Sequence, residues 1–279
     1  MTYAVVREKV DDFFGFIWNT ILNYIVDFIE ETGELATFGW RATQLIFEKP
    51  YRWVELIQHM EFIGNQSLQI ILLSGIFTGM ALALQIYLGF KIVNASSLVG
   101  PTVALAITRE LGPVLTGLIV AARAGGAMAA RLGSMRVTEQ IDAIEVMGVN
   151  PVQYLVSPRI LAAVLVMPLL TGVFDFIAIA GCWLISIKLL GMDEAQFWDK
   201  ISQWLQPFHI YEGLFKAGVF GLFFAVICTN RGYNTKGGAE GVGSATNKGV
   251  VLSMVMIIIL DFFVSNLIQM FYAVKASFL

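Results

Sequence analysis

Charged residues are scarce in this sequence: Asp, Glu, Lys and Arg make up 14% of its 279 residues, against 57% hydrophobic residues. An ordinary soluble domain is about a quarter charged. Because so little polar surface cannot cover the chain in water, lipid must form part of its solvent. The formal net charge of −3 also excludes the broad basic face that nucleic-acid binding requires.

Cysteine and histidine are almost absent. Cys182 and Cys228 lie in apolar runs without metal-ligand spacing, and His59 and His209 stand alone. We therefore expect no metal site and no oxidising compartment. No Ser/His/Asp or Cys/His set is visible, and the Gly-rich stretch 232–249 lacks the GxxxxGK[ST] order that cradles nucleotide phosphates. The sequence predicts no catalytic residues and no ATP site, with 232–249 as a flexible cytoplasmic loop.

Long apolar runs accompany the scarcity of charge. A membrane core about 30 Å thick needs roughly 20 apolar residues per helix. The sequence predicts five spans, at about 62–90, 99–122, 160–187, 214–230 and 249–272. Most Lys and Arg residues outside these spans fall on the N-terminal side of the membrane, which places the N-terminus in the cytoplasm. An odd number of spans then places the C-terminus on the opposite side.

The first sixty residues are predicted to lie on the membrane rather than cross it. Apolar residues from Phe14 to Ile29 recur at three- and four-residue steps, while acidic residues interrupt them. This pattern is typical of an interfacial helix, or of a helix packed on a soluble core. A second, weaker interfacial helix is predicted at 35–47. We expect interfacial helices over 1–60 and one transmembrane domain over 61–279.

A charged pair, Arg109 and Glu110, interrupts the second span. Charges at bilayer depth cost at least ~2.5 kcal/mol each and usually face a bundle interior or a wet cavity. Pro113 removes the amide that would bond the carbonyl of Arg109, leaving an acceptor free at the same level. With the amide of Gln85 in the first span, these groups indicate the polar wall of an amphiphile cavity. The alternatives are an ion pair between helices and, for Gln85, an interhelical hydrogen bond.

Four further residues at membrane depth invite attention. Gly75 and Gly79 form a GxxxG pattern, which indicates close helix packing. Asp175 and Asp261 are single carboxylates without a visible partner. A proton pathway would use such groups, but the sequence does not show that they meet.

Segment 138–148 predicts a short cytoplasmic helix between the second and third spans. Thr138 is the expected N-cap and Gly148 the expected end. Acidic residues follow at three-residue spacing, alongside an apolar edge formed by Ile141, Ile144 and Met147. Such a helix suits docking into a groove of a partner protein, although a solvated loop helix would show the same pattern.

Three stretches of the sequence resemble the MlaE/YrbE permease family. They are SGIFTGMALALQIYL at 74–88, RELGPVLTGLIVAARAGGAMAARLGSMRVTEQIDAIEVMGVNPVQYLVSPR at 109–159 and GAEGVGSATNKGVV at 238–251. The resemblance runs from about residue 64 to the C-terminus. It implies an all-α polytopic membrane protein with N-terminal interfacial helices, five transmembrane helices and a coupling helix between the second and third.

The resemblance also implies a function. The chain would be the permease subunit of an ABC transporter that moves phospholipid between the bacterial inner membrane and an MCE protein, supporting outer-membrane lipid asymmetry. The implied partners are a second copy of the chain, an ATPase that binds ATP and Mg²⁺, an MCE-domain protein and a small STAS-domain accessory subunit. This chain itself would need no cofactor, and its C-terminus would be periplasmic.

Matching positions imply the site residues. Near the lipid cavity they place Leu82, Gln85, Phe90, Arg109, Glu110 and Leu111. On the ATPase-coupling helix they place Glu139, Gln140, Ile141, Asp142, Ile144 and Glu145. Lys216 matches a basic position that would meet a lipid headgroup. Val93 departs from the aromatic residue that the family often has beyond the first span.

Two other classes of protein compete with this interpretation. A membrane-embedded lipid-modifying enzyme would need a clustered nucleophile or metal set, which the sequence lacks. A secondary transporter would usually show internal repeats and would not need a docking helix.

Overall fold

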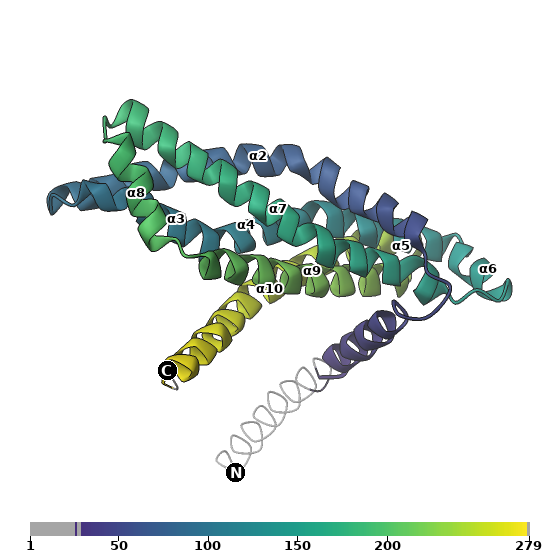
Figure 1. Ribbon diagram of the computed structural model, residues 1–279. Helices are drawn as coiled ribbons and strands as arrows, with labels where there is room; N and C mark the ends of the chain where they lie inside the picture. The colour runs from purple at the N-terminus through teal and green to yellow at the C-terminus, as the bar shows by residue number, and fades with distance from the viewer. Residues whose placement is uncertain (1–25, 27–28, 278–279) are drawn as a thin grey trace, which may run out of the picture. The chain divides into compact units, whose positions relative to one another are not determined.

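The computed structural model describes residues 26 and 29–277, which contain helices and no β-strand (Figure 1). The chain divides into two compact units, Met1–Arg41 and Ala42–Leu279. Residues 29–44 are helical, so a helix is present where the second interfacial helix is predicted, while its place at the membrane interface stays a prediction. The first predicted interfacial helix falls almost entirely outside the described residues.

Five helical stretches within the second unit are long and apolar enough to cross a membrane. The first is α2 (Trp53–Ile92), and the fourth and fifth are α9 (Pro207–Tyr233) and α10 (Gly238–Ser277). The second stretch consists of η1 (Ser96–Leu98), α3 (Val99–Ala106), η2 (Ile107–Leu111), α4 (Gly112–Val120), η3 (Ala121–Gly125) and α5 (Gly126–Val137). The third consists of η4 (Val152–Val156), α7 (Ser157–Trp183) and η5 (Leu184–Leu189). The prediction of an all-α polytopic membrane protein is confirmed.

Each spanning helix is longer than the apolar run that predicted it. The first begins at Trp53 rather than 62, and the fourth begins at Pro207 rather than 214. Proline suits the first position of a helix, where its missing N–H would have had no partner. The helices continue into the interfacial region, where polar residues are tolerated and apolar composition no longer marks them.

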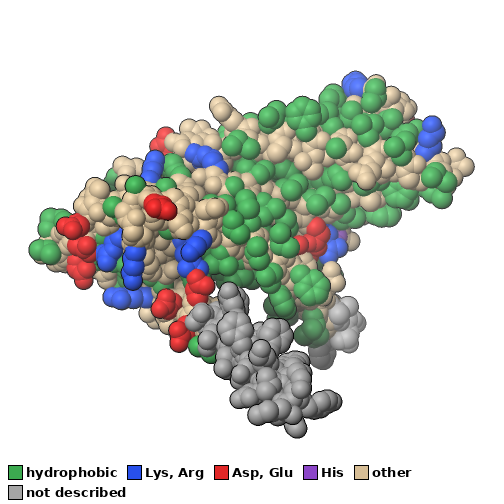
Figure 2. Space-filling view, turned by 180° about the vertical axis from the view of Figure 1, so that it is seen from behind, with side chains coloured by type: hydrophobic (Ala, Val, Ile, Leu, Met, Phe, Trp, Pro, Cys, Tyr) green, Lys and Arg blue, Asp and Glu red, His purple; other side chains and the backbone are tan. Residues whose placement is uncertain are grey.

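Charged side chains are concentrated at the ends of the spanning helices. Figure 2 shows a largely apolar surface, with acidic and basic side chains gathered mainly at the end that carries α6 (Gln140–Val146) and a few basic ones at the other end. A small group of charges interrupts the apolar surface between them. This distribution is the one expected of helices that cross a hydrocarbon layer.

The prediction of a flexible loop at 232–249 is wrong. Only residues 234–237 connect α9 to α10, which is helical from Gly238 onward. The small residues there permit close packing: a Cβ on Gly249 would lie 3.6 Å from Cys228 Cα on α9. A Cβ on Gly126 of α5 would likewise lie 3.1 Å from Val250 Cγ2 on α10. Tertiary packing thus overrides the low helix propensity of glycine.

Glycines also bring α2 and α7 together, as the GxxxG pattern predicts. A Cβ on Gly79 would overlap the carbonyl of Ala178, and one on Gly75 would lie 3.2 Å from the carbonyl oxygen of Phe174. On α7, a Cβ on Gly181 would overlap the carbonyl of Ile76. The two backbones therefore approach each other more closely than larger residues would allow.

A short amphipathic helix that the sequence did not predict, α8 (Glu194–Trp204), precedes the fourth span. The side chain of Asp193 caps it by accepting a 2.7 Å hydrogen bond from the backbone N–H of Gln196. Its buried residues Phe197 and Ile201 pack against α3, where Gly100 leaves room for the Phe197 ring.

Candidate functional site

The candidate site forms where a π-helical turn interrupts the second span. The turn, η2, carries Arg109 and Glu110, and its Ile107 carbonyl accepts from the N–H of Gly112, five residues later. Pro113 has no N–H, so the carbonyl of Arg109 lacks its helical donor. The Nζ of Lys216 on α9 donates to this carbonyl over 2.8 Å. The free acceptor that the sequence predicts is therefore present, and a lysine fills it.

Lys216 is the centre of a charged network. Its side chain is 0% exposed, and its Nζ lies 2.7 Å from Glu110 Oε2 and 3.4 Å from Asp261 Oδ1 on α10. With the Arg109 carbonyl, these acceptors match the three protons of an ammonium group. Lys216 thus ties together the second, fourth and fifth spans.

Arg109 does not pair with Glu110 but with a second residue of α9. Its Nε lies 3.1 Å from Glu212 Oε2, and its Nη2 lies 3.4 Å from Glu212 Oε1. Such two-point contacts between guanidinium and carboxylate fix orientation as well as charge. The two neighbouring charges of η2 are therefore neutralised separately, by Glu212 and Lys216.

Helix geometry explains how α9 and α10 present these groups. Glu212 and Lys216 are four residues apart on α9, so they lie on one face of the helix. Asp261 and Ser265 have the same spacing on α10. The Ser265 hydroxyl lies 2.7 Å from the Asp261 carbonyl oxygen and 3.2 Å from Glu110 Oε2.

A glycine allows α9 to approach the π-helical turn. A Cβ on Gly213 would overlap the carbonyl oxygen of Thr108, directly before Arg109. Gly213 lies between the two charged residues of α9, so it sets the distance over which both ion pairs form.

The network is buried on one side and open on the other. Lys216 and Glu212 are fully enclosed, whereas the Glu110 side chain is 41% exposed and those of Arg109 and Asp261 are partly exposed. If all five groups are ionised, two positive charges face three negative ones. The open side therefore exposes both a guanidinium and carboxylates.

The side chains of the other residues predicted near the cavity make no hydrogen bond to the network in the described part of the chain. Leu111 is half-buried in η2, and Leu82 and Phe90 are half-buried on α2. Gln85 is exposed on α2 and makes no hydrogen bond within the described part of the chain. Within the described part of the chain, side-chain hydrogen bonds and ion pairs between the predicted cavity residues link only Arg109, Glu110 and Lys216.

Sequence reasoning missed Glu212 and Ser265, and it left Asp261 without a partner. The available signal was the spacing of Glu212 and Lys216, but the fourth span was predicted to begin after Glu212. The structure buries Lys216 in α9, one turn after Glu212. A pair of opposite charges four residues apart at the start of an apolar run was sufficient to indicate a buried site.

Asp175 does not join this network. It is buried in α7, and its Oδ1 has no hydrogen-bond partner among the described residues. The carboxylate lies against Gly112, where any larger residue would overlap it. The sequence shows no partner for Asp175 or Asp261. In the structure Asp261 belongs to the network and Asp175 does not.

The predicted helix between the second and third spans is present as α6. Ile141 is buried with Leu132 and Leu155, and Ile144 packs against them, so these two residues of the apolar edge anchor the helix, whereas Met147 is exposed. Glu139, Gln140, Asp142 and Glu145 are exposed. Asp142 Oδ1 lies 2.5 Å from Nη1 of Arg136, a residue of α5.

The predicted cap of α6 is wrong. Thr138 Oγ1 donates to the Ser134 carbonyl over 2.8 Å, and Glu139, with φ of 58°, occupies the N-cap position. The Thr138 hydroxyl therefore bonds to the last turn of α5, and no side chain caps the start of α6. Gly148, with φ of 78°, follows the end of α6 as predicted.

Known proteins match most of the chain. The family described as Permease MlaE matches residues 56–267. A probable ABC transporter permease protein of Rickettsia conorii is 38% identical over 251 residues, which cover 90% of this chain and 97% of the relative. The intermembrane phospholipid transport system permease protein MlaE of Haemophilus influenzae is 37% identical over 242 residues, covering 85% and 92%.

A plant protein also matches. The chloroplastic protein TRIGALACTOSYLDIACYLGLYCEROL 1 of Arabidopsis thaliana is 38% identical over 221 residues, covering 79% of this chain and 63% of the relative. The family match spans all the residues of the charged network and the whole of α6. This multi-pass membrane protein therefore belongs to the MlaE permease family.

Proposed function

We propose that this chain is the permease subunit of an ABC transporter that moves phospholipid between the inner membrane and an MCE protein. The single observation that carries the proposal is the charged network around Lys216. Three spanning helices place ionised groups at membrane depth, where such groups are costly and usually serve a substrate path. The name of the Haemophilus relative, a phospholipid transport permease, supports the same substrate class.

The open side of the network supports a homodimer. Glu110 is 41% exposed on a surface that lipid would otherwise cover. A second copy facing the first would enclose two such networks in one cavity and shield them from the hydrocarbon. In this arrangement lipid headgroups meet Glu110, Arg109 and Asp261, while Lys216 holds the helices that present them.

The proposal assigns the other parts of the transporter to other chains. A separate ATPase binds ATP and Mg²⁺ and docks on α6, an MCE-domain protein exchanges lipid, and a small STAS-domain subunit accompanies the ATPase. In bacteria with two membranes such transport would maintain outer-membrane lipid asymmetry. The N-terminus would be cytoplasmic and the C-terminus periplasmic.

We expect Glu110→Gln to reduce phospholipid retained by the purified protein while leaving its thermal stability close to that of the parent. The fold survives because Lys216 keeps Asp261 and the Arg109 carbonyl as partners, and Arg109 keeps Glu212. Mass spectrometry of bound lipid, with a melting curve of the same sample, measures both quantities. A large loss of stability with normal lipid content would show that Glu110 is structural.

Reversing charge on α6 should weaken the binding of the ATPase. Glu145 is exposed beside Val146 and Met147, which are 89% and 71% exposed, so this tip is free to contact another protein. We expect Glu145→Lys with Met147→Ser to weaken ATPase co-purification by about tenfold, equivalent to ~1.4 kcal/mol. Asp142 is left intact because it pairs with Arg136.

The matched control is Asp199→Lys on α8, which Figure 1 shows at the opposite end of the second unit from α6. It reverses one exposed charge without touching the proposed docking surface. If both variants retain the ATPase equally well, the tip of α6 is not its docking surface.

A further inference from the structure

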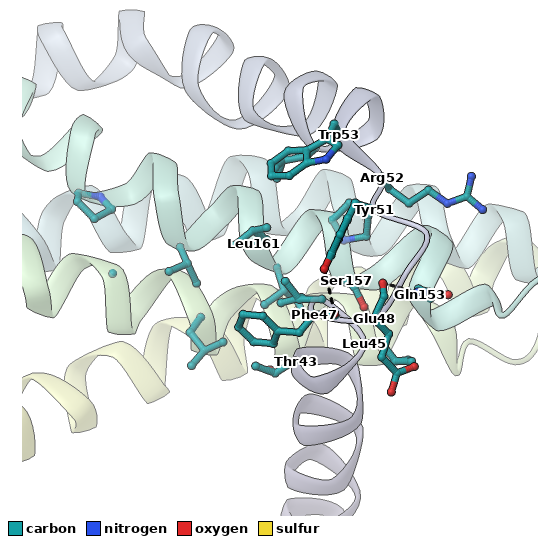
Figure 3. Close-up of a pocket in the computed structure, with 18 of the residues that line it drawn as sticks. Thr43, Leu45, Phe47, Glu48, Tyr51, Arg52, Trp53, Gln153, Ser157 and Leu161 are labelled. Atoms are coloured by element: carbon teal, nitrogen blue, oxygen red, sulfur yellow. Dashed lines mark hydrogen bonds between the residues drawn. The ribbon is translucent and has the colours of Figure 1, made fainter.

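A cavity lies apart from the charged network. It is a groove of about 690 Å³ between residues 43–53, α7 and α9 (Figure 3). Most of its wall is apolar, and no residue of the charged network lines it. Its volume is within the range of small-molecule sites, roughly 300–1,000 Å³.

The groove has the length of one membrane leaflet. Its wall on α7 extends from Ser157 to Pro168, which at 1.5 Å per residue is about 16 Å. Half of a hydrocarbon core about 30 Å thick is almost the same length. On α9 the wall runs antiparallel, from Leu222 to Leu214. The groove therefore follows the path of one lipid acyl chain.

Residues with low helix propensity shape the groove. Pro168 lies inside α7 and Gly218 faces it from α9, where a Cβ would lie 3.7 Å from Pro168 Cγ. Proline and glycine are the two least favourable residues in a helix interior. Their presence at facing positions keeps the space between the two helices free of larger side chains.

One end of the groove carries the features of a membrane–water interface. Phe47, Tyr51 and Trp53 are exposed there, and Figure 3 places Arg52, Glu48 and Gln153 at the same end, with Leu161 deeper. Aromatic residues concentrate at the level of lipid headgroups. The other end, near Leu214, would then reach toward the centre of the bilayer.

The polar end matches a zwitterionic headgroup. Arg52 is the N-cap of α2 and no side chain caps this helix, so N–H groups of its first turn remain available to an anion. Arg52 Nε is buried without a hydrogen-bond partner among the described residues. The guanidinium lies 4.0 Å from Glu55 and over the Tyr154 ring, with Cζ 4.7 Å from the ring centre. Glu48 lines the same end and is exposed, and its carboxylate has the charge to complement an ammonium group.

We propose that this groove binds one zwitterionic glycerophospholipid of the adjoining leaflet. One acyl chain lies between α7 and α9, the phosphate contacts Arg52 and the start of α2, and the ammonium group faces Glu48. The site is distinct from the charged network and does not depend on transport. Bound lipid would hold residues 43–53 against α7 and α9.

The test uses the full chain in vesicles of phosphatidylethanolamine and phosphatidylglycerol. A trace of phosphatidylethanolamine carries a photoreactive group on one acyl chain, and labelled peptides are identified by mass spectrometry after irradiation. We expect labelling to concentrate on Leu161, Val164 and Val219. Gly218→Leu fills the groove, and Arg52→Gln removes the phosphate contact. Each should reduce labelling at these positions about tenfold.

Leu169→Phe is the matched control, because it enlarges an exposed side chain of α7 that does not line the groove. It should leave the labelling unchanged. Even labelling along the exposed face of α7 would overturn the proposal in favour of ordinary boundary lipid. A photoreactive amino acid placed at position 215 that cross-links to another copy of the chain would overturn it in favour of a protein interface. Wild-type labelling in Arg52→Gln would also overturn it, whether or not Gly218→Leu folds.

Discussion

Lys216→Met is expected to destabilise the protein by about 3–5 kcal/mol and to abolish lipid transport. Methionine is close to lysine in length but supplies no charge and no donor. Its introduction leaves Glu110, Asp261 and the Arg109 carbonyl without the cation that they share. Removing one partner of a buried ion pair is costly because the other charges remain in a low-dielectric environment.

The stability and transport effects can be separated. Neutralising the carboxylates in the same chain, with Glu110→Gln and Asp261→Asn, should restore much of the stability without restoring transport. Lys188→Met, an exposed lysine in η5, is the matched control and should change neither. Thermal unfolding in detergent and lipid exchange in reconstituted vesicles measure the two effects. A Lys216→Met protein as stable as the control would contradict the central place of Lys216.

We expect a larger loss of stability on removing Lys216 than on removing Glu110, because the two side chains differ in how many partners they have. Removing Glu110 leaves Lys216 with two acceptors, whereas removing Lys216 takes the shared cation from three acceptors and leaves Glu110 only the Ser265 hydroxyl. Arg109 is unaffected by either change because its partner is Glu212. The sequence alone suggests a different result. There Glu110 directly follows Arg109 and would be expected to neutralise its charge.

Features determined by local chemistry could be predicted from the sequence. The five spans follow from apolar composition, and close packing of the first span against another helix follows from Gly75 and Gly79. The free carbonyl of Arg109 follows from Pro113. Each depends on residues within a few positions of one another, so tertiary structure changes it little.

Features determined by the register between distant helices could not be predicted. Nothing local states that Lys216 lies beside Asp261 or that Arg109 faces Glu212. The π-helical turn η2 also rotates the charges relative to a regular α-helix, which sequence periodicity assumes. The loop predicted at 232–249 was wrong for a related reason, since packing against α5 and α9 outweighs the low helix propensity of its glycines.

The charged network depends on one close backbone contact as well as on its charges. Gly213 lies where α9 touches η2, and its neighbours are Glu212 on one side and, a turn later, Lys216. A Cβ there would overlap the Thr108 carbonyl oxygen and lie 3.3 Å from Pro113 Cγ. Neither atom belongs to a flexible side chain that could move aside.

Gly213→Ala is therefore expected to destabilise the protein by about 1–3 kcal/mol and to impair transport severely. In a helix interior, alanine in place of glycine would by itself add roughly 0.5–1 kcal/mol of stability, so the sign of the effect reports the steric overlap. Relief of the overlap requires α9 to move away from η2, which lengthens the contacts of both Glu212 and Lys216. Gly172→Ala on α7 is the matched control, because its Cβ would lie an ordinary 3.8 Å from Leu214 Cδ2. Melting curves and lipid exchange of the two variants are compared side by side. If Gly213→Ala were as stable and as active as Gly172→Ala, the close approach of α9 to the π-helical turn would not be what forms the site.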